Sequence, residues 1–206
     1  YPYRRGRGYL SRVTGRIRRV VTVHPKSEKY VFIHGPENPD ETWYYDFHHR
    51  RGVIVESGKV SNLDAMDITA PYTPGALRGG SHVHVFSPNG ERVSFTYNDH
   101  VMHELDPALD LRNVGVAAPF GPVNVQKQHP REYSGSHWCV LVSKTTPTPQ
   151  PGSDEINRAY EEGWVGNHAL AFIGDTLSPK ARKCRSCLLS SCRKMKLAGK
   201  WQVMRR

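Results

Sequence analysis

The sequence predicts an all-β protein, mainly because one strand–turn–strand pattern occurs twice. Residues 22–35 read TVHPKSEKYVFIHG and residues 85–97 read VFSPNGERVSFTY. When Pro25 and Pro88 are aligned, both stretches continue with a polar turn and then a strand of β-branched and aromatic residues with alternating character. Proline fixes one turn position, and the Asn-Gly pair after Pro88 tolerates positive φ, which favours a tight turn. Such a hairpin is typical of the inner strands of a β-propeller blade.

These motifs resemble a known family. The stretch SPNGERVSFTY (87–97) is similar to the blade signature of TolB-type propellers, and WYYD (43–46) is similar to a third strand of such a blade. Residues 21–179 as a whole resemble the interior of YidR-like proteins, an uncharacterised family of TolB-like β-propellers. The resemblance implies a propeller fold and leaves the function open, because one fold serves many functions.

Charge divides the chain into three parts. Residues 1–20 carry seven Arg and no acid, residues 180–206 carry ten Lys or Arg and no acid, and residues 21–179 carry 12 basic and 19 acidic residues. We therefore predict propeller blades over 21–179 between two foreign basic ends. Both ends can be explained by out-of-frame translation. Suitable codons for 2–12, read one base later, give HTGEVEVIYR, and suitable codons for 180–188, read two bases later, give GEKVPELF. Both peptides fit strands expected in the family.

On this interpretation the chain is a partial TolB-like β-propeller. About 160 in-frame residues at ~40–45 residues per blade correspond to about three to four blades of a longer ring. An incomplete ring exposes strand edges and lacks neighbours for its outer faces. Because several blades contact a ligand on the axis, we expect this truncated fragment to have lost the function of the intact protein.

The sequence contains no signal for a membrane. No apolar run of about 18 residues predicts a transmembrane helix. Residues 1–20 are basic but have no apolar core of the kind found in signal peptides. We therefore expect a cytoplasmic location and no membrane partner.

Histidines supply the candidate metal site. The stretch GGSHVH (79–84) ends in two histidines separated by one residue, and residues i and i+2 of a strand point to the same face. His82 and His84 are therefore predicted as ligands of one divalent metal such as Mn²⁺, with His34 and His137 as further candidates. Histidines near a turn are more often ordinary hydrogen-bonding residues, so that alternative stays open.

A second, more distant resemblance concerns the same chemistry. FIHGP (32–36) followed by WYYD (43–46) is similar to a segment of oligogalacturonate lyases. Those enzymes are seven-bladed propellers that hold a divalent metal mainly through histidine. The resemblance implies metal-assisted removal of the proton next to a uronate carboxylate, with His82 and His84 as the corresponding metal ligands.

Three functions follow from these patterns. The leading hypothesis is a non-enzymatic binding scaffold for a protein or a small carbohydrate ligand at the propeller axis, and the uronate lyase is the alternative. The third is nucleic-acid binding through the basic ends, and the excess of acids over 21–179 argues against it. Cys184, Cys187 and Cys192 have spacing that suggests zinc, but a fourth ligand is missing, and Cys139 is expected to be a buried thiol.

Local patterns add three expectations. Ser153 as a helix cap, acids in the first turn and Gly163 as a stop predict a helix over residues 154–162. Residues 42–47 are predicted to form a strand. The stretch HHRR (48–51) is predicted to be a solvated hairpin turn.

Overall fold

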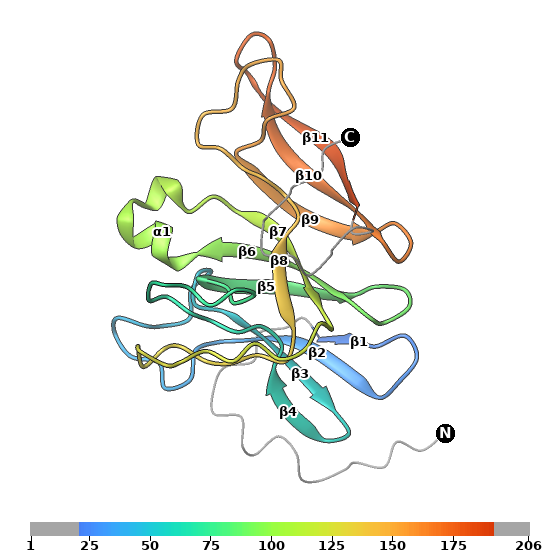
Figure 1. Cartoon of the computed structure of the whole chain (residues 1–206). Helices are drawn as coiled ribbons and strands as arrows, with labels where there is room; N and C mark the ends of the chain where they lie inside the picture. The colour runs from blue at the N-terminus through green and yellow to red at the C-terminus, as the bar shows by residue number, and fades with distance from the viewer. Residues whose placement is uncertain (1–20, 192–206) are drawn as a thin grey trace.

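The computed structural model describes residues 21–191, and these residues form an all-β protein, as predicted. Their strands make three antiparallel sheets, which Figure 1 shows stacked one above another. The helical elements in this range are the short helix α1 (His100–Leu105) and the 3-10 turn η2 (Pro107–Leu109). Both lie between two strands of the middle sheet.

Each sheet is built from consecutive strands. The first contains β1 (Val21–Val23), β2 (Lys29–His34), β3 (Arg51–Glu56) and β4 (Lys59–Asn62). The second contains β5 (Gly79–Phe86), β6 (Val93–Asp99), β7 (Asn113–Ala118) and β8 (Trp138–Leu141). The third contains β9 (Arg158–Trp164), β10 (Ala169–Leu177) and β11 (Lys183–Ser191). Strands that follow one another in sequence pair antiparallel, as in the blades of a propeller. The number of sheets is consistent with the expected three to four blades, and the propeller arrangement itself, as part of a longer ring, stays a prediction.

The repeated turn adopts the conformation that its sequence favours. Between β5 and β6, the Ser87 N–H donates to the Arg92 carbonyl at 2.8 Å and the Gly90 N–H donates to the Ser87 carbonyl at 2.8 Å. Gly90 has φ +81°, where glycine carries no steric penalty. A related turn joins β10 to β11, with the Ala181 N–H donating to the Ser178 carbonyl at 2.8 Å.

The hydrophobic core lies in two layers, one on each side of the middle sheet. Between the first and second sheets, Val31 and Ile54 pack with Phe95 and other residues of β5 to β8. Between the second and third sheets, Val114 and Val116 pack against the third sheet, including Leu170 and Phe172 of β10. All residues of β6 are buried, so this strand is central to the molecule.

The helix predicted over residues 154–162 is wrong. Residues 158–164 form β9, which pairs with β10. Ala159 of this strand and Ile156 just before it are buried in the core. The Ser153 hydroxyl accepts from the Glu155 N–H at 3.2 Å within a turn, so it caps no helix. Pairing with a long neighbouring strand outweighs the local helix signals, whose contribution is small.

The strand predicted over residues 42–47 is also wrong. Asp40 Oδ1 accepts hydrogen bonds from the backbone N–H groups of Thr42 at 2.9 Å and Trp43 at 2.8 Å. These bonds fold the segment into a turn, which is a common role of aspartate. The next strand of the first sheet is β3, which begins at Arg51.

The described part of the chain extends beyond the predicted boundary at residue 179. Strand β11 pairs with β10 from Lys183 to Ser191. Residues 1–20 and 192–206, including Cys192, lie outside the described residues, so the out-of-frame interpretation of the two ends stays a prediction. Between residues 21 and 191, no helix is long and apolar enough to cross a membrane.

Candidate functional site

The two histidines predicted as metal ligands lie on β5, but the strand is irregular between them. Val83 has φ +56°, and the register with β6 shifts between His82 and Val85. A bulge of this kind breaks the simple alternation of side chains. Regular strand alternation therefore does not place His82 and His84 on one face in this part of β5.

His84 belongs to a buried polar network. Its Nε2 lies 3.0 Å from the Ser81 hydroxyl, which donates to Asp64 Oδ1 at 2.9 Å, and the Gly52 N–H donates to the same oxygen at 2.7 Å. Burial lowers the pKa of His84 to about 3 and raises the pKa of Asp64 to about 6. In a catalytic triad the carboxylate contacts the histidine, whereas here Asp64 contacts Ser81, and all these groups are buried. The arrangement is therefore suited to holding β3 and β5 together rather than to nucleophilic catalysis.

His82 lies in a cationic environment. Burial is the main cause that lowers its pKa to about 3, and the charges of Arg50 and Arg112 act in the same direction. Neighbouring cations oppose the binding of a metal ion. Among residues 21–191, neither His82 nor His84 belongs to a group of three ligand side chains whose donor atoms lie within 4.8 Å of one another.

The two further candidates lie in other surroundings. His34 Nδ1 is 2.6 Å from the Gly35 carbonyl oxygen, and His137 Nδ1 is 2.9 Å from the Ser136 hydroxyl. Burial lowers the pKa of both imidazoles, that of His137 to about 4. Neither histidine joins His82 or His84 in a group of ligand atoms, and metal binding by this set stays a prediction.

A different set of side chains does converge, and we call it the histidine cluster. It contains His48, His49, His100, His103 and Asp110. His48 and His49 precede β3, and Asp110 follows η2. His100 and His103 are three residues apart on α1 and therefore lie on one side of it.

The turn predicted at residues 48–51 is present over residues 47–49, but its predicted exposure to solvent is wrong. His48 and His49 are 5% and 4% exposed, and Arg51 is 5% exposed. The Trp43 ring stacks on His49 with centroids 3.8 Å apart and planes at 20°. Aromatic packing of this kind removes the imidazole from water. The sequence of residues 48–51 contains no pattern that predicts this burial.

The members of the histidine cluster are close enough to act together. His49 Nε2 lies 3.3 Å from His100 Nδ1. The rings of His48 and His103 stack with centroids 4.2 Å apart and planes at 23°. His103 Nδ1 lies 3.7 Å from Asp110 Oδ2, which is too long for a hydrogen bond.

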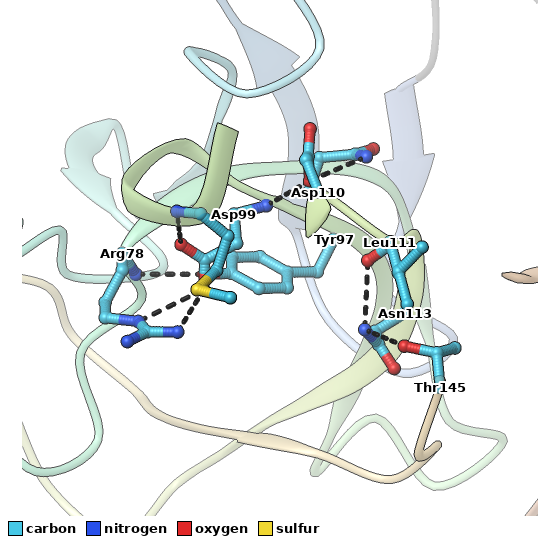
Figure 2. A network of polar contacts seen from close by, with 9 residues as sticks. Arg78, Tyr97, Asp99, Asp110, Leu111, Asn113 and Thr145 are labelled. Atoms are coloured by element: carbon cyan, nitrogen blue, oxygen red, sulfur yellow. Dashed lines mark hydrogen bonds and ion pairs between the residues drawn. The ribbon is translucent and has the colours of Figure 1, made fainter. Parts of the chain in front are cut away.

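Hydrogen bonds hold α1 and Asp110 in place (Figure 2). The Asp99 carboxylate accepts from the Met102 N–H at 3.0 Å, which caps α1, and it also pairs with the Arg78 guanidinium. Asp110 Oδ1 accepts from the Asp99 N–H at 2.7 Å and from the Asn98 amide at 3.2 Å. One oxygen of Asp110 is therefore fixed by its neighbours, while Oδ2 has no hydrogen-bond partner in the described structure.

Burial also sets the charge of the cluster. It lowers the pKa of His48 to about 4 and the pKa of His100 to about 3, and the neighbouring histidines act in the same direction. Both imidazoles are therefore neutral near pH 7, with a lone pair on one nitrogen.

In the sequence, the spacing of His100 and His103 was the one available signal for this site, and it becomes informative only when that stretch is known to be helical.

A shallow hollow lies beside the histidine cluster and shares His49 with it. Its lining combines aromatic, basic and acidic side chains: Trp43, His49, Arg51, Lys127, Arg131, Glu132 and Tyr133 are among them. The Arg131 guanidinium carbon lies 5.7 Å from the centroid of the Trp43 ring, within cation–π range. Arg51 donates to Glu37 at 2.6 Å, while its buried Nε has no hydrogen-bond partner within residues 21–191.

Comparison with known proteins defines the family. The model of the family described as "Protein of unknown function (DUF3748)" matches residues 18–133, more than half of the chain. The chain belongs to the DUF3748 family. "Uncharacterized protein YidR" of Escherichia coli (strain K12) is 96% identical over 164 residues, which are 80% of this chain and 40% of that protein. The chain thus spans well under half of the length of this curated relative. No solved structure matches the chain.

The segment that matches DUF3748 contains the whole histidine cluster and the whole lining of the hollow. The predicted resemblance to YidR-like proteins is confirmed by this comparison. Neither the family description nor the relative's name specifies a ligand or a reaction. The resemblance to oligogalacturonate lyases stays a prediction.

Proposed function

We propose that this chain is part of a non-enzymatic binding module, built from propeller blades, that takes a small acidic carbohydrate in the hollow beside Trp43. The observation that carries the proposal is the combination of an aromatic side chain with Arg51, Lys127 and Arg131 in one lining. Aromatic side chains provide flat apolar contact, while a few placed polar groups fix a ligand's orientation. Arginine pairs with carboxylates through several N–H donors.

The two arginines of the hollow are positioned before a ligand arrives. Arg131 donates to the carbonyl oxygens of Glu37 at 3.0 Å and Asn38 at 2.8 Å, and it also pairs with Asp40. Arg51 is held by its ion pair with Glu37, a carboxylate that is 67% exposed. Such fixed cations lose little freedom when an acidic ligand binds, which favours affinity.

A titration of uronate-containing and neutral disaccharides tests the proposal. We would use digalacturonate and a neutral galactose disaccharide, with this chain and with the full-length 96% identical relative. We expect the acidic disaccharide alone to bind, and a Lys127→Glu variant to bind it about tenfold more weakly. Lys144→Glu is the matched control, because Lys144 is exposed and lies outside the hollow.

Two results would overturn the proposal. One is failure of the full-length relative to bind the acidic disaccharide, and the other is equal weakening by the two lysine variants. Release of an unsaturated uronate product would favour the lyase alternative over a binding module. Because the lysine variants leave the histidine cluster intact, this test is independent of any metal.

A further inference from the structure

We propose that the histidine cluster holds a divalent first-row transition metal ion, with His48, His103 and Asp110 as its protein ligands. These residues differ from the His82 and His84 pair that the sequence suggested. The site lies between the segment that precedes β3 and the helix α1, so one ion would tie the first sheet to the second.

Unpartnered polar atoms are the first argument. His48 Nδ1, His103 Nδ1 and Asp110 Oδ2 are buried and have no hydrogen-bond partner among the described residues. Buried polar atoms of folded proteins nearly always have a partner, because leaving one unpaired is costly. Three such atoms on neighbouring residues can share one partner, and two imidazole nitrogens with a carboxylate oxygen are donor atoms that suit a metal cation.

The geometry is the second argument. One donor atom from each of the three residues lies within 4.8 Å of the others, and His103 Nδ1 is 3.7 Å from Asp110 Oδ2. A tetrahedral ion bound at about 2.0–2.2 Å places its ligand atoms roughly 3.4 Å apart. The separations between donor atoms would therefore have to shorten by about 0.3 Å to about 1.4 Å at most to complete the site.

The surroundings of Asp110 are the third argument. Its Oδ1 is held by the Asp99 N–H and the Asn98 amide, which orients Oδ2. Hydrogen bonds of this kind to the second oxygen are typical of carboxylates that bind metals.

The other overlapping group, His48 with His49 and His100, is less suitable. His49 Nδ1 lies 2.9 Å from the Tyr44 carbonyl oxygen, and His49 Nε2 lies 3.3 Å from His100 Nδ1, so both nitrogens of His49 already have partners.

The donor set indicates the class of ion. Imidazole favours Zn²⁺, Co²⁺ and Ni²⁺, whereas Mg²⁺ and Ca²⁺ prefer sites made of oxygen alone. Two imidazoles and one carboxylate, with a position left for water, therefore fit Zn²⁺ or Co²⁺ best.

Zinc titration of the full 206-residue chain tests this proposal. Thiolates are themselves good zinc ligands, so the exposed Cys184 and Cys187, and with them Cys192, are first replaced by serine. After dialysis against EDTA, we expect one Zn²⁺ per chain and a higher melting temperature with zinc. His103→Ala and Asp110→Asn should each weaken zinc binding at least about a hundredfold. His24→Ala is the matched control, since His24 is a half-buried histidine of the turn between β1 and β2, outside the cluster, and its loss should leave zinc binding unchanged.

X-ray absorption on the zinc-loaded chain is the second measurement, and it needs no substitution in the cluster. We expect only nitrogen and oxygen neighbours around the ion. The proposal fails if the serine background binds no zinc. It also fails if the ion has sulfur neighbours in the cysteine-containing chain and zinc binding is lost when the cysteines are replaced. A third contrary result is zinc binding by both cluster variants as tight as that of the His24→Ala control.

Discussion

Thr96 on β6 donates a hydrogen bond of 2.9 Å to the Glu162 carboxylate on β9, and this contact joins the second sheet to the third. Glu162 is 7% exposed, and its other oxygen has no hydrogen-bond partner in the described residues. Burial raises the pKa of Glu162 to about 7, although the Arg112 charge acts in the opposite direction. The carboxyl group is therefore a pH-sensitive part of the interface between the sheets.

Replacing Glu162 should change the pH dependence of stability. The pKa of Glu162 is higher in the folded state than its ordinary value of 4.5, so the folded state binds more protons than the unfolded chain. The contribution of Glu162 to stability therefore falls as pH rises from about 4.5 to about 7. We expect Glu162→Gln to be more stable than the parent by about 1–3 kcal/mol at pH 8, and to show a smaller difference at pH 5. Urea unfolding at both pH values measures this. The exposed neighbour variant Glu161→Gln should show no such change, and an equal change there would contradict the assignment.

Asp99 should contribute to stability in two separable ways. It caps α1 through the Met102 N–H and pairs with Arg78, whose Nε donates at 3.1 Å. Asp99→Ala removes both interactions and should cost about 2–3 kcal/mol in free energy of unfolding. Asp99→Asn retains a good cap and should cost about 1 kcal/mol. Denaturant unfolding of both variants measures the difference, and equal losses would show that the cap contributes nothing.

Gly115 on β7 has no room for a side chain. It lies opposite Phe95 in the sheet, and a Cβ atom there would be 2.4 Å from the Phe95 ring. Because Phe95 is fully buried, the ring cannot move into solvent, and Gly115→Ala should cost about 1–3 kcal/mol. In a Phe95→Leu background the added methyl group should cost less. Chemical denaturation of the four chains measures this coupling, and strictly additive losses would contradict the predicted clash.

Ala181 is a site for stabilisation. It has φ +55° in the β10–β11 turn, where its N–H donates to the Ser178 carbonyl as the Gly90 N–H does to Ser87. A left-handed backbone costs alanine about 1–2 kcal/mol. Glycine avoids this cost, but it loses more conformational entropy on folding than alanine, which offsets part of the gain. Ala181→Gly should therefore raise stability by about 0.5–1 kcal/mol. Thermal unfolding monitors the change, and a lower melting temperature would show that the turn carries no such strain.

The sequence by itself determined the fold class and the positions of several strands. The repeated Pro-containing turns and the alternation over residues 93–97 specify hairpins, because turn geometry and period-two patterning are local properties of the chain. The resemblance to YidR-like proteins likewise rested on local motifs, and the family comparison confirmed it. Cys139 is buried, as its apolar neighbours predicted.

The tertiary structure alone decided where the histidines gather. His48 and His49 meet α1 only because the first and second sheets lie against each other, and a sequence pattern within residues 48–51 contains no information about that contact. The same reason explains β9, whose residues carry helical signals but pair with β10. Helix propensities of ordinary residues differ by about 0.7 kcal/mol at most. Burial of one large apolar side chain against a neighbouring sheet contributes about 1.5–3 kcal/mol. Contacts between distant segments therefore prevail wherever the two disagree.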